Sequence, residues 1–227
     1  MHTLLHLLSQ SKPALIMSLP KNDPALCRAA FEEGADAVKV HINVEHRASG
    51  SRFDRLDEER AALEEMLRHA SGPMGLMIGA SLEAAALDAD EAARMSFDFF
   101  SVYAHHMPVL DPAHSPTWMV ACDGSYSCEE VAAMERVGAS VLEASIMPGS
   151  EYGQPLSMRD LMRYSVLRAH TALPIVVPTQ RAVRPEEVRA LYHAGMNGLM
   201  IGAVVTGQTK DSIRQAVRAF RQAIDRI

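Results

Sequence analysis

The sequence predicts a single-domain α/β protein, a (β/α)8 TIM barrel formed by residues 1–227. Short β-rich runs alternate with longer amphipathic stretches, and each pair occupies roughly 25 to 30 residues, as parallel βα units do. An open doubly wound sheet is the competing layout, but near-equal units without a large insertion favour closure into a barrel. The eight expected strands are Ala14–Leu19, Ala37–Asn43, Met74–Ala80, Phe97–Tyr103, Trp118–Cys122, Ser140–Ile146, Ile175–Thr179 and Gly198–Val204.

The helices between these strands have recognisable ends. A first helix is expected within Met1–Leu8, and Asp23 with Pro24 supplies an N-cap and a first-turn proline for the helix Ala25–Glu33, which Gly34 ends. Other expected N-caps are Ser81, Ser127 and Ser157, and other expected helix stops are Gly138 and Gly195. Two long loops, Val44–Leu56 and Ala104–Thr117, follow strands, which places them at the catalytic end of a barrel.

Composition and charge exclude several classes of protein. The net charge is -6 and the basic residues are scattered, so no basic stripe indicates nucleic acid as a partner. No apolar run is long enough to cross a bilayer, so no membrane partner is expected. The three cysteines, Cys27, Cys122 and Cys128, never form a CxxC pair, which fits a reducing cytoplasm. A homodimer is compatible with the sequence on general grounds, although no helix shows an obvious apolar seam.

Polar residues interrupt the apolar alternation of two strands. Val38, Val40 and Ile42 form one face of the second strand, so Lys39, His41 and Asn43 are expected to point into the barrel. By the same alternation, Glu143 and Ser145 of the sixth strand are also expected to point inward. A lysine and a glutamate inside one barrel must pair or be used, because an unpaired buried charge is costly.

These residues carry the predicted chemistry. Lys39 is expected to be a general acid/base or a Schiff-base amine, with Glu143 as its partner or as a second proton carrier. The alternative is an ion pair that only fills the barrel. We also expect His41 and Asp123 to be catalytic and Asn43 and His105 to contact the substrate, because barrels place polar ligands at strand ends.

Five histidines fall at or after the second and fourth strands. They are His41, His46, His105, His106 and His114. A metal held by His41, by His105 or His106, and by Glu45 or Asp123 is an alternative to proton transfer, but no ligand pair has a fixed spacing, so no metal is expected. The loop from His46 to Arg52 is small and basic, which suits either a lid over an anionic ligand or an ordinary mobile loop.

The end of the chain resembles a known superfamily. The stretches PIVVPTQRAVRPEEV (residues 174–188) and GLMIGAVVTG (residues 198–207) resemble the closing units of the ribulose-phosphate-binding barrels, which include the N-acylmannosamine-6-phosphate epimerases. The resemblance covers about a quarter of the chain and implies a phosphate cradle after the last two strands, where free N–H groups and a helix dipole favour an anion.

Carried over by position, the resemblance implies that Gly202, Ala203, Thr206 and Gly207 form the half of the cradle after strand eight. The glycine-rich turn usual after strand seven is replaced here by Thr179, Gln180 and Arg181, and the Arg181 guanidinium could bind the phosphate instead. The alternative is that Gly202 and Gly207 are ordinary turn glycines and Arg181 is a solvated charge.

Together these features predict an isomerase, epimerase or lyase that acts on a small phosphorylated metabolite. One alternative is a non-catalytic sensing barrel similar to the glycerol-3-phosphate-responsive antiterminators, which share the phosphate end, and another is hydrolysis based on the histidines. The sequence contains neither a GxGxxG motif nor a phosphate-loop lysine motif, so no cofactor is expected, although flavin binds the phosphate site of some related barrels.

Overall fold

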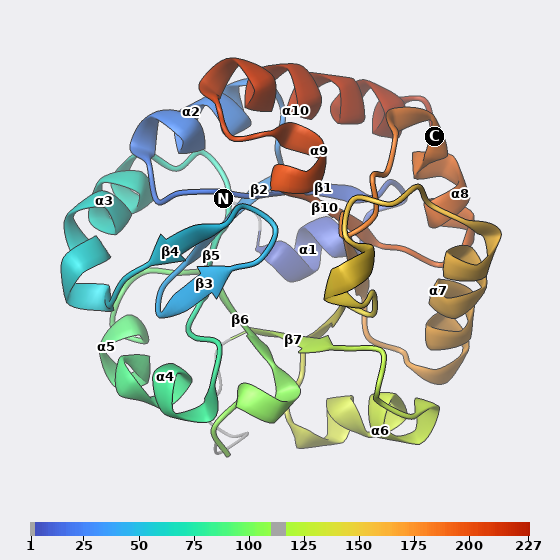
Figure 1. Cartoon of the computed structure of the whole chain (residues 1–227), viewed down its shortest axis with the longest axis horizontal. Coiled ribbons are helices and arrows are strands. Elements are labelled where there is room, and N and C mark those ends of the chain that lie inside the picture. Colours follow the sequence, from blue (N-terminus) through green and yellow to red (C-terminus); the bar gives the residue numbers. More distant parts are fainter. Residues whose placement is uncertain (1–2, 110–116) are drawn as a thin grey trace.

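The computed structural model describes residues 3–109 and 117–227, and its eight parallel strands close into a barrel (Figure 1). The order around the barrel is β1-β10-β9-β8-β7-β6-β5-β2, so neighbours in the chain are neighbours in space. The strands are β1 (Ala14–Ser18), β2 (Ala37–His41), β5 (Met74–Met77), β6 (Phe99–Tyr103), β7 (Trp118–Cys122), β8 (Val141–Ala144), β9 (Ile175–Pro178) and β10 (Gly198–Ile201). The predicted (β/α)8 fold is confirmed.

The helices form the outer ring of the barrel, and their ends follow the predicted signals. Ser127 and Ser157 each form a capping box with the acidic residue three positions on, and Gly34, Gly138 and Gly195 end helices with φ angles of 100° to 103°. The helices are α2 (Pro24–Glu32), α3 (Leu56–His69), α4 (Leu82–Leu87), α5 (Ala89–Ala92), α6 (Cys128–Ala133), α7 (Met158–His170), α8 (Val188–His193), α9 (Ala203–Thr206) and α10 (Lys210–Asp225). Within the described ranges no helix combines the length and the apolar character needed to span a membrane.

Most strands end earlier than the sequence predicts. β2 stops at His41 because Asn43 has a left-handed backbone, with φ 55°, which turns the chain out of the strand. β10 stops at Ile201, and the apolar residues that follow begin α9 with Gly202 as the N-cap. The expectation that Asn43 and Val204 lie within strands is therefore wrong, since apolar composition alone does not show where a chain turns.

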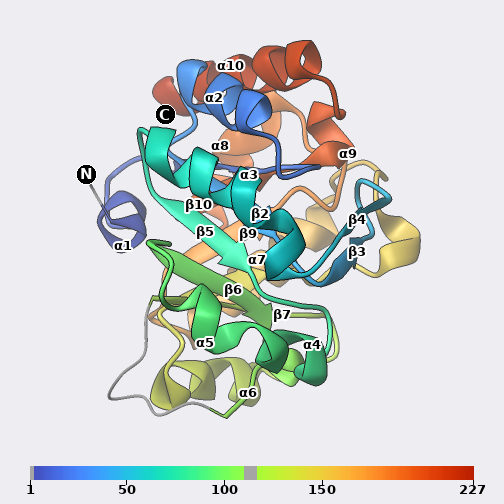
Figure 2. The ribbon, with the colours of Figure 1, turned by 90° about the vertical axis from the view of Figure 1, so that its left-hand side faces the viewer.

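The first long loop contains a hairpin that the sequence did not predict. β3 (Val44–His46) and β4 (Ser51–Phe53) pair antiparallel, and buried Val44 and Phe53 pack against Met77. Figure 2 shows the hairpin at the opposite end of the barrel from α1. The second predicted loop begins with the 3-10 turn Ala104–His106, and its residues 110–116 lie outside the described part of the chain.

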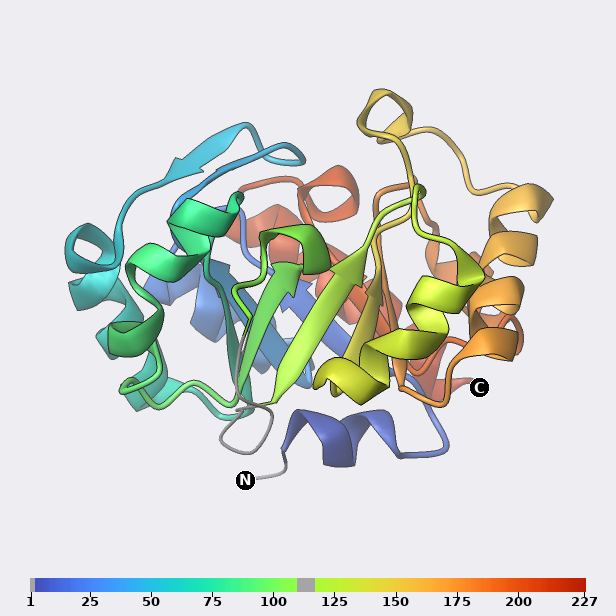
Figure 3. The same ribbon diagram turned by 90° about the horizontal axis from the view of Figure 1, so that it is seen from below.

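The lower half of the barrel interior is apolar. Ile16, Phe99, Met119, Val141 and Val176 fill it and are no more than 1% exposed. The short helix α1 (Leu4–Leu8) crosses beneath the strands, and its Leu4 and Leu8 pack on this cluster (Figure 3). In the described part of the chain, α1 therefore covers the amino-terminal end of the barrel, and the polar side chains of the interior lie toward the other end.

Candidate active site

The strand register stacks the inward side chains of the upper barrel in layers, as alternate strands of such barrels do. From the floor upward these layers hold Lys39, Ser101, Glu143 and Met200, then Ser18, Met77, Ala121 and Pro178, and then His41, Tyr103, Ser145 and Gly202. All twelve residues line one cavity of about 690 Å³ at the carboxyl ends of the strands. The cavity is large enough for a small metabolite.

Lys39 and Glu143 meet at the floor of this cavity from opposite strands, β2 and β8. The distance from Lys39 Nζ to Glu143 Oε2 is 2.9 Å, and the two side chains are 6% and 7% exposed. Ser101 Oγ donates to Oε2 and Ser145 Oγ donates to Oε1, each over 3.0 Å. The structure therefore holds a lysine and a glutamate as an ion pair in one nearly buried position.

His41 lies above this pair, against the hairpin. Its ring centroid is 4.6 Å from that of His46 and 4.7 Å from that of Phe53, and its Nε2 is 3.4 Å from Ser18 Oγ. Burial lowers the pKa of His41 well below its usual value, and the charges of His46 and Lys39 lower it further. Its Nδ1 has no hydrogen-bond partner among the residues that the structure describes. Burial therefore favours the neutral imidazole, and the unpartnered Nδ1 is itself buried in the cavity wall.

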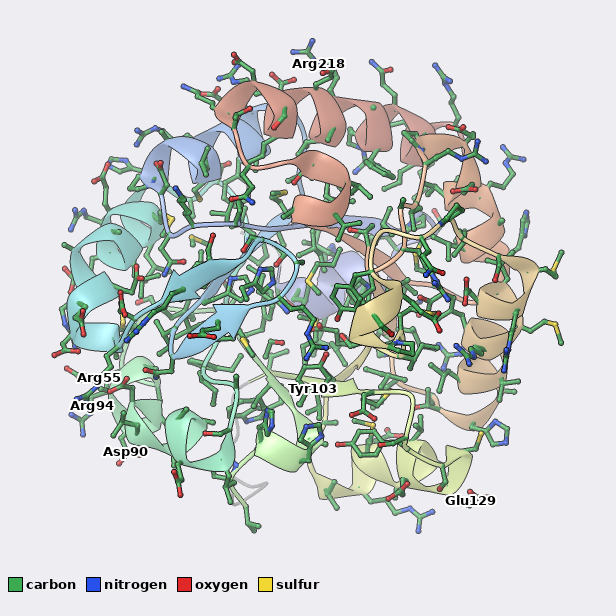
Figure 4. The ribbon with its side chains drawn as sticks, viewed as in Figure 1. Arg55, Asp90, Arg94, Tyr103, Glu129 and Arg218 are labelled. Carbon is green, nitrogen blue, oxygen red and sulfur yellow. The ribbon has the colours of Figure 1, made fainter. Side chains whose placement is uncertain are left out.

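Tyr103 and Tyr152 are cavity residues that the sequence interpretation missed. Tyr103 occupies the top interior layer of β6, near the centre of the barrel mouth in Figure 4, and burial raises the pKa of its phenol. It interacts with Ser145, which in turn donates to Glu143. The alternation of Phe99, Ser101 and Tyr103 could have revealed it. Tyr152 lies in the loop after β8, where the sequence gives no periodic signal.

Two residues that were predicted to bind the substrate form hydrogen bonds or ion pairs with other side chains of the protein. Asn43 Nδ2 donates to Asp88 Oδ2 over 2.9 Å, so Asn43 does not line the cavity as the inward alternation predicted. The Arg181 guanidinium is 8% exposed and forms ion pairs with Asp160, at 3.1 Å, and with Glu151. Its use as a phosphate ligand stays a prediction.

The predicted phosphate end divides into residues that face the cavity and residues that do not. Thr179, Gln180 and Gly202 line it, whereas Ala203, Thr206 and Gly207 do not. Thr179 Oγ1 accepts from Gly202 N over 3.0 Å, and the Gln180 side chain accepts from Met147 N and donates to Tyr152 OH. These bonds fix the cavity wall immediately before α9 begins.

Asp123, His105 and His106 lie at the cavity rim. Asp123 Oδ1 accepts from the backbone N–H and the hydroxyl of Ser125, which lowers the pKa of Asp123, and His105 Nδ1 lies 2.7 Å from Tyr126 OH. Throughout residues 3–109 and 117–227, no three His, Cys, Asp or Glu side chains gather as a metal site. His114 falls among the residues that are not described.

Fold and site together define a (β/α)8 barrel with a polar cavity at the strand carboxyl ends, where barrel enzymes carry their active sites. No family model matches the sequence, and no curated protein matches it.

Solved structures do match. A variant of the tryptophan synthase alpha-subunit from Pyrococcus furiosus has a TM-score of 0.72 at 17% identity, with 93% of this chain and 98% of that chain covered. Thiamine phosphate pyrophosphorylase from Pyrococcus furiosus has a TM-score of 0.61 at 16% identity, with 94% and 96% covered. The structure titled "Native KDPGal structure" has a TM-score of 0.61 at 19% identity, with 96% and 97% covered. These similarities confirm the barrel fold.

Proposed function

We propose that this chain is an enzyme that moves a proton beside the carbonyl group of a small phosphorylated compound. Isomerases, epimerases and aldolase-type lyases share this step. The observation that carries the proposal is the ion pair of Lys39 and Glu143, held at 2.9 Å on the floor of a cavity that opens where the strands end. Perturbed or paired ionisable groups in such a cavity are the usual agents of proton transfer.

The pair can divide the work of forming an enolate. The Glu143 carboxylate takes the proton from the carbon beside the carbonyl, and the electron pair of that C–H bond moves onto the carbonyl oxygen. The Lys39 ammonium group donates a hydrogen bond to this oxygen and stabilises the negative charge in a mostly dry site. Return of the proton from Glu143 to the neighbouring carbon, with one proton moved from the first substrate oxygen to the second, gives the isomer.

The same two groups also fit carbon–carbon cleavage through a Schiff base. Lys39 would first pass its proton to Glu143, and the free amine would then condense with a carbonyl group and release water. Ser101 and Ser145 keep the Glu143 carboxylate in place in either reaction. His41 lines the same cavity above this pair.

The phosphorylated substrate is supported by the wall of β9 and β10. Gly202 lines the cavity and is the N-cap of α9, so a phosphate at this wall would lie near the amino-terminal end of that short helix. Thr179 adds a hydroxyl beside them. One similar barrel, thiamine phosphate pyrophosphorylase, is named for a phosphorylated compound.

Solvent exchange tests the proposal directly. Wild-type protein is incubated in D2O with ketose phosphates such as dihydroxyacetone phosphate and ribulose 5-phosphate, and deuterium at the carbon beside the carbonyl is followed by NMR. We expect exchange in the wild type, loss of exchange in Glu143→Gln, and normal exchange in Glu135→Gln, which changes an exposed glutamate outside the cavity.

Borohydride trapping separates the Schiff-base route from the enolate route. A stable covalent adduct at Lys39 after reduction supports the Schiff base, and exchange without an adduct supports the enolate. Binding of these compounds without exchange, at several pH values, would argue against an enzyme and favour a sensing barrel. Absence of any thermal shift with millimolar inorganic phosphate or sugar phosphates would remove the phosphate part of the proposal.

A further inference from the structure

Two arginines line the cavity, one from the hairpin after β2 and one from α7 after β8. Arg47 lies at the turn of the β3–β4 hairpin, and Arg163 lies in the second turn of α7. Neither forms an ion pair with a carboxylate in residues 3–109 or 117–227. The cavity is thus lined by two arginines without a carboxylate partner in the described part of the fold, Arg47 exposed at the rim and Arg163 half-buried.

Arg47 is held in position by neutral groups. Its guanidinium carbon is 6.0 Å from the centroid of the Tyr152 ring, a cation–π arrangement. A Cβ atom on Gly149 would lie 2.2 Å from Arg47 Nη1, so only glycine at that position lets the guanidinium lie against the loop after β8. Gln208 Nε2 also donates to Ser49 O over 2.8 Å and ties down the hairpin. The side chain therefore reaches from the hairpin after β2 to the loop after β8.

The carboxylates of this wall are engaged elsewhere. Glu151 and Asp160, from the loop after β8 and the first turn of α7, both bind Arg181. Asp160 lies three residues before Arg163 in the helix, a spacing at which side chains can meet. It is 1% exposed, however, and its carboxylate also accepts a hydrogen bond from the Ser157 hydroxyl. Both acids are thus paired with Arg181, and neither forms an ion pair with Arg163.

Other acids of the cavity are similarly engaged. Glu143 binds Lys39, and Asp123 accepts two hydrogen bonds from Ser125. Glu45, on the hairpin beside Arg47, is exposed to solvent. An anion that enters the cavity is therefore the natural partner for Arg47 and Arg163.

We infer that Arg47 and Arg163 bind a second anionic group of the substrate, so that the substrate class is doubly anionic. The inference rests on the proposed function, because the first anion is the phosphate expected beside Gly202. β8 and β10 are separated by one strand, so their carboxyl ends lie on the order of 10 Å apart. A chain of about six carbons with a charge at each end spans that distance, and the planar guanidinium forks suit a carboxylate or a second phosphate.

Matched sugar derivatives test this inference. 6-Phosphogluconate and sorbitol 6-phosphate are open six-carbon chains that differ in having a carboxylate or a hydroxymethyl group at the far end. Fructose 1,6-bisphosphate and fructose 6-phosphate form the second pair, which tests phosphate as the second anion. Calorimetry measures their affinities for the wild type, for Arg47→Gln, for Arg163→Gln and for the control Arg159→Gln, which removes an exposed arginine of the same helix outside the cavity.

We expect the wild type to prefer the doubly charged member of at least one pair by about tenfold or more. Each cavity variant should reduce that preference several-fold, and Arg159→Gln should leave it unchanged. Equal affinities within both pairs, or equal weakening of both members by the cavity variants, would overturn the second-anion site while the phosphate site stands. Failure of the wild type to bind any of these compounds or inorganic phosphate would overturn the proposed function as well.

Discussion

Replacing Lys39 with methionine separates a structural lysine from a catalytic one. Methionine keeps most of the aliphatic volume and removes only the amine. The change leaves the Glu143 carboxylate, 7% exposed, without its charged partner, although Ser101 and Ser145 still donate to it. Breaking a buried pair costs about 3–5 kcal/mol, and the two remaining hydroxyls place the expected loss near the lower end of that range. Adding Glu143→Gln removes the stranded charge and should restore about 2 kcal/mol.

The assay is urea unfolding of the wild type, both single variants and the double variant, followed by circular dichroism, with deuterium exchange measured on the same preparations. We expect the double variant to be more stable than Lys39→Met, because it no longer leaves a buried carboxylate without a charged partner. We also expect it to catalyse no exchange, because it lacks both groups that the proposed proton transfer needs. A loss below about 1 kcal/mol in Lys39→Met, with no coupling to Glu143, would refute the energetic reasoning. Normal exchange by Lys39→Met would refute the catalytic assignment.

Three further predictions concern the groups around the cavity. Burial and the charge of Lys39 lower the pKa of His46 from 6.5 to about 4, so the unfolded chain binds a proton that the folded chain does not. The His46 contribution to stability should therefore be complete above pH 6.5 and fall by up to about 3 kcal/mol toward pH 4. Burial also lowers the pKa of His41, so His46→Gln should reduce the acid-induced loss without abolishing it, and an unchanged profile would contradict this. In Gly75→Ala the new Cβ would lie 2.0 Å from the Phe99 ring, so we expect a loss of about 1–3 kcal/mol by thermal unfolding, partly recovered by Phe99→Leu; a neutral effect would contradict the packing. Arg181→Met should lower the free energy of unfolding by about 3–5 kcal/mol because it strands Asp160, which is 1% exposed, and an unchanged urea midpoint would show that the ion pair is not essential.

The sequence was sufficient to predict the barrel and the floor of its cavity. Side chains of a strand alternate between two faces, so a charge between apolar residues must point inward or be exposed. Lys39 lies between Val38 and Val40, and Glu143 lies between Leu142 and Ala144. Because inward residues from opposite strands of a small barrel share one interior, their pairing followed from the cost of an unpaired charge.

The rim of the cavity was harder to predict because periodicity stops where a strand ends. Asn43 continues the inward row in the sequence, but its left-handed backbone turns the side chain toward Asp88. The sequence suggested that Arg181 could bind a phosphate because it does not reveal the ion-pair partners of this residue. Asp160 and Glu151 lie 21 and 30 residues earlier in the chain and meet Arg181 only in the folded protein. The hairpin that carries Arg47 was hidden by its small polar turn.

The division of the barrel interior gives a physical argument for chemistry at Lys39 and Glu143. On β6 and β8, Phe99 and Val141 face the apolar lower half, and two residues further on Ser101 and Glu143 face the cavity. An apolar pair of similar volume would stabilise the layer of Lys39 and Glu143 as well as the ion pair does. The free-energy cost of removing two charges from water offsets most of their mutual attraction. A charged pair at the lowest interior level that lines the cavity, above the apolar half covered by α1, therefore adds little to the fold. Its cost is best explained by the proton transfer that an acid and a base in that position can perform.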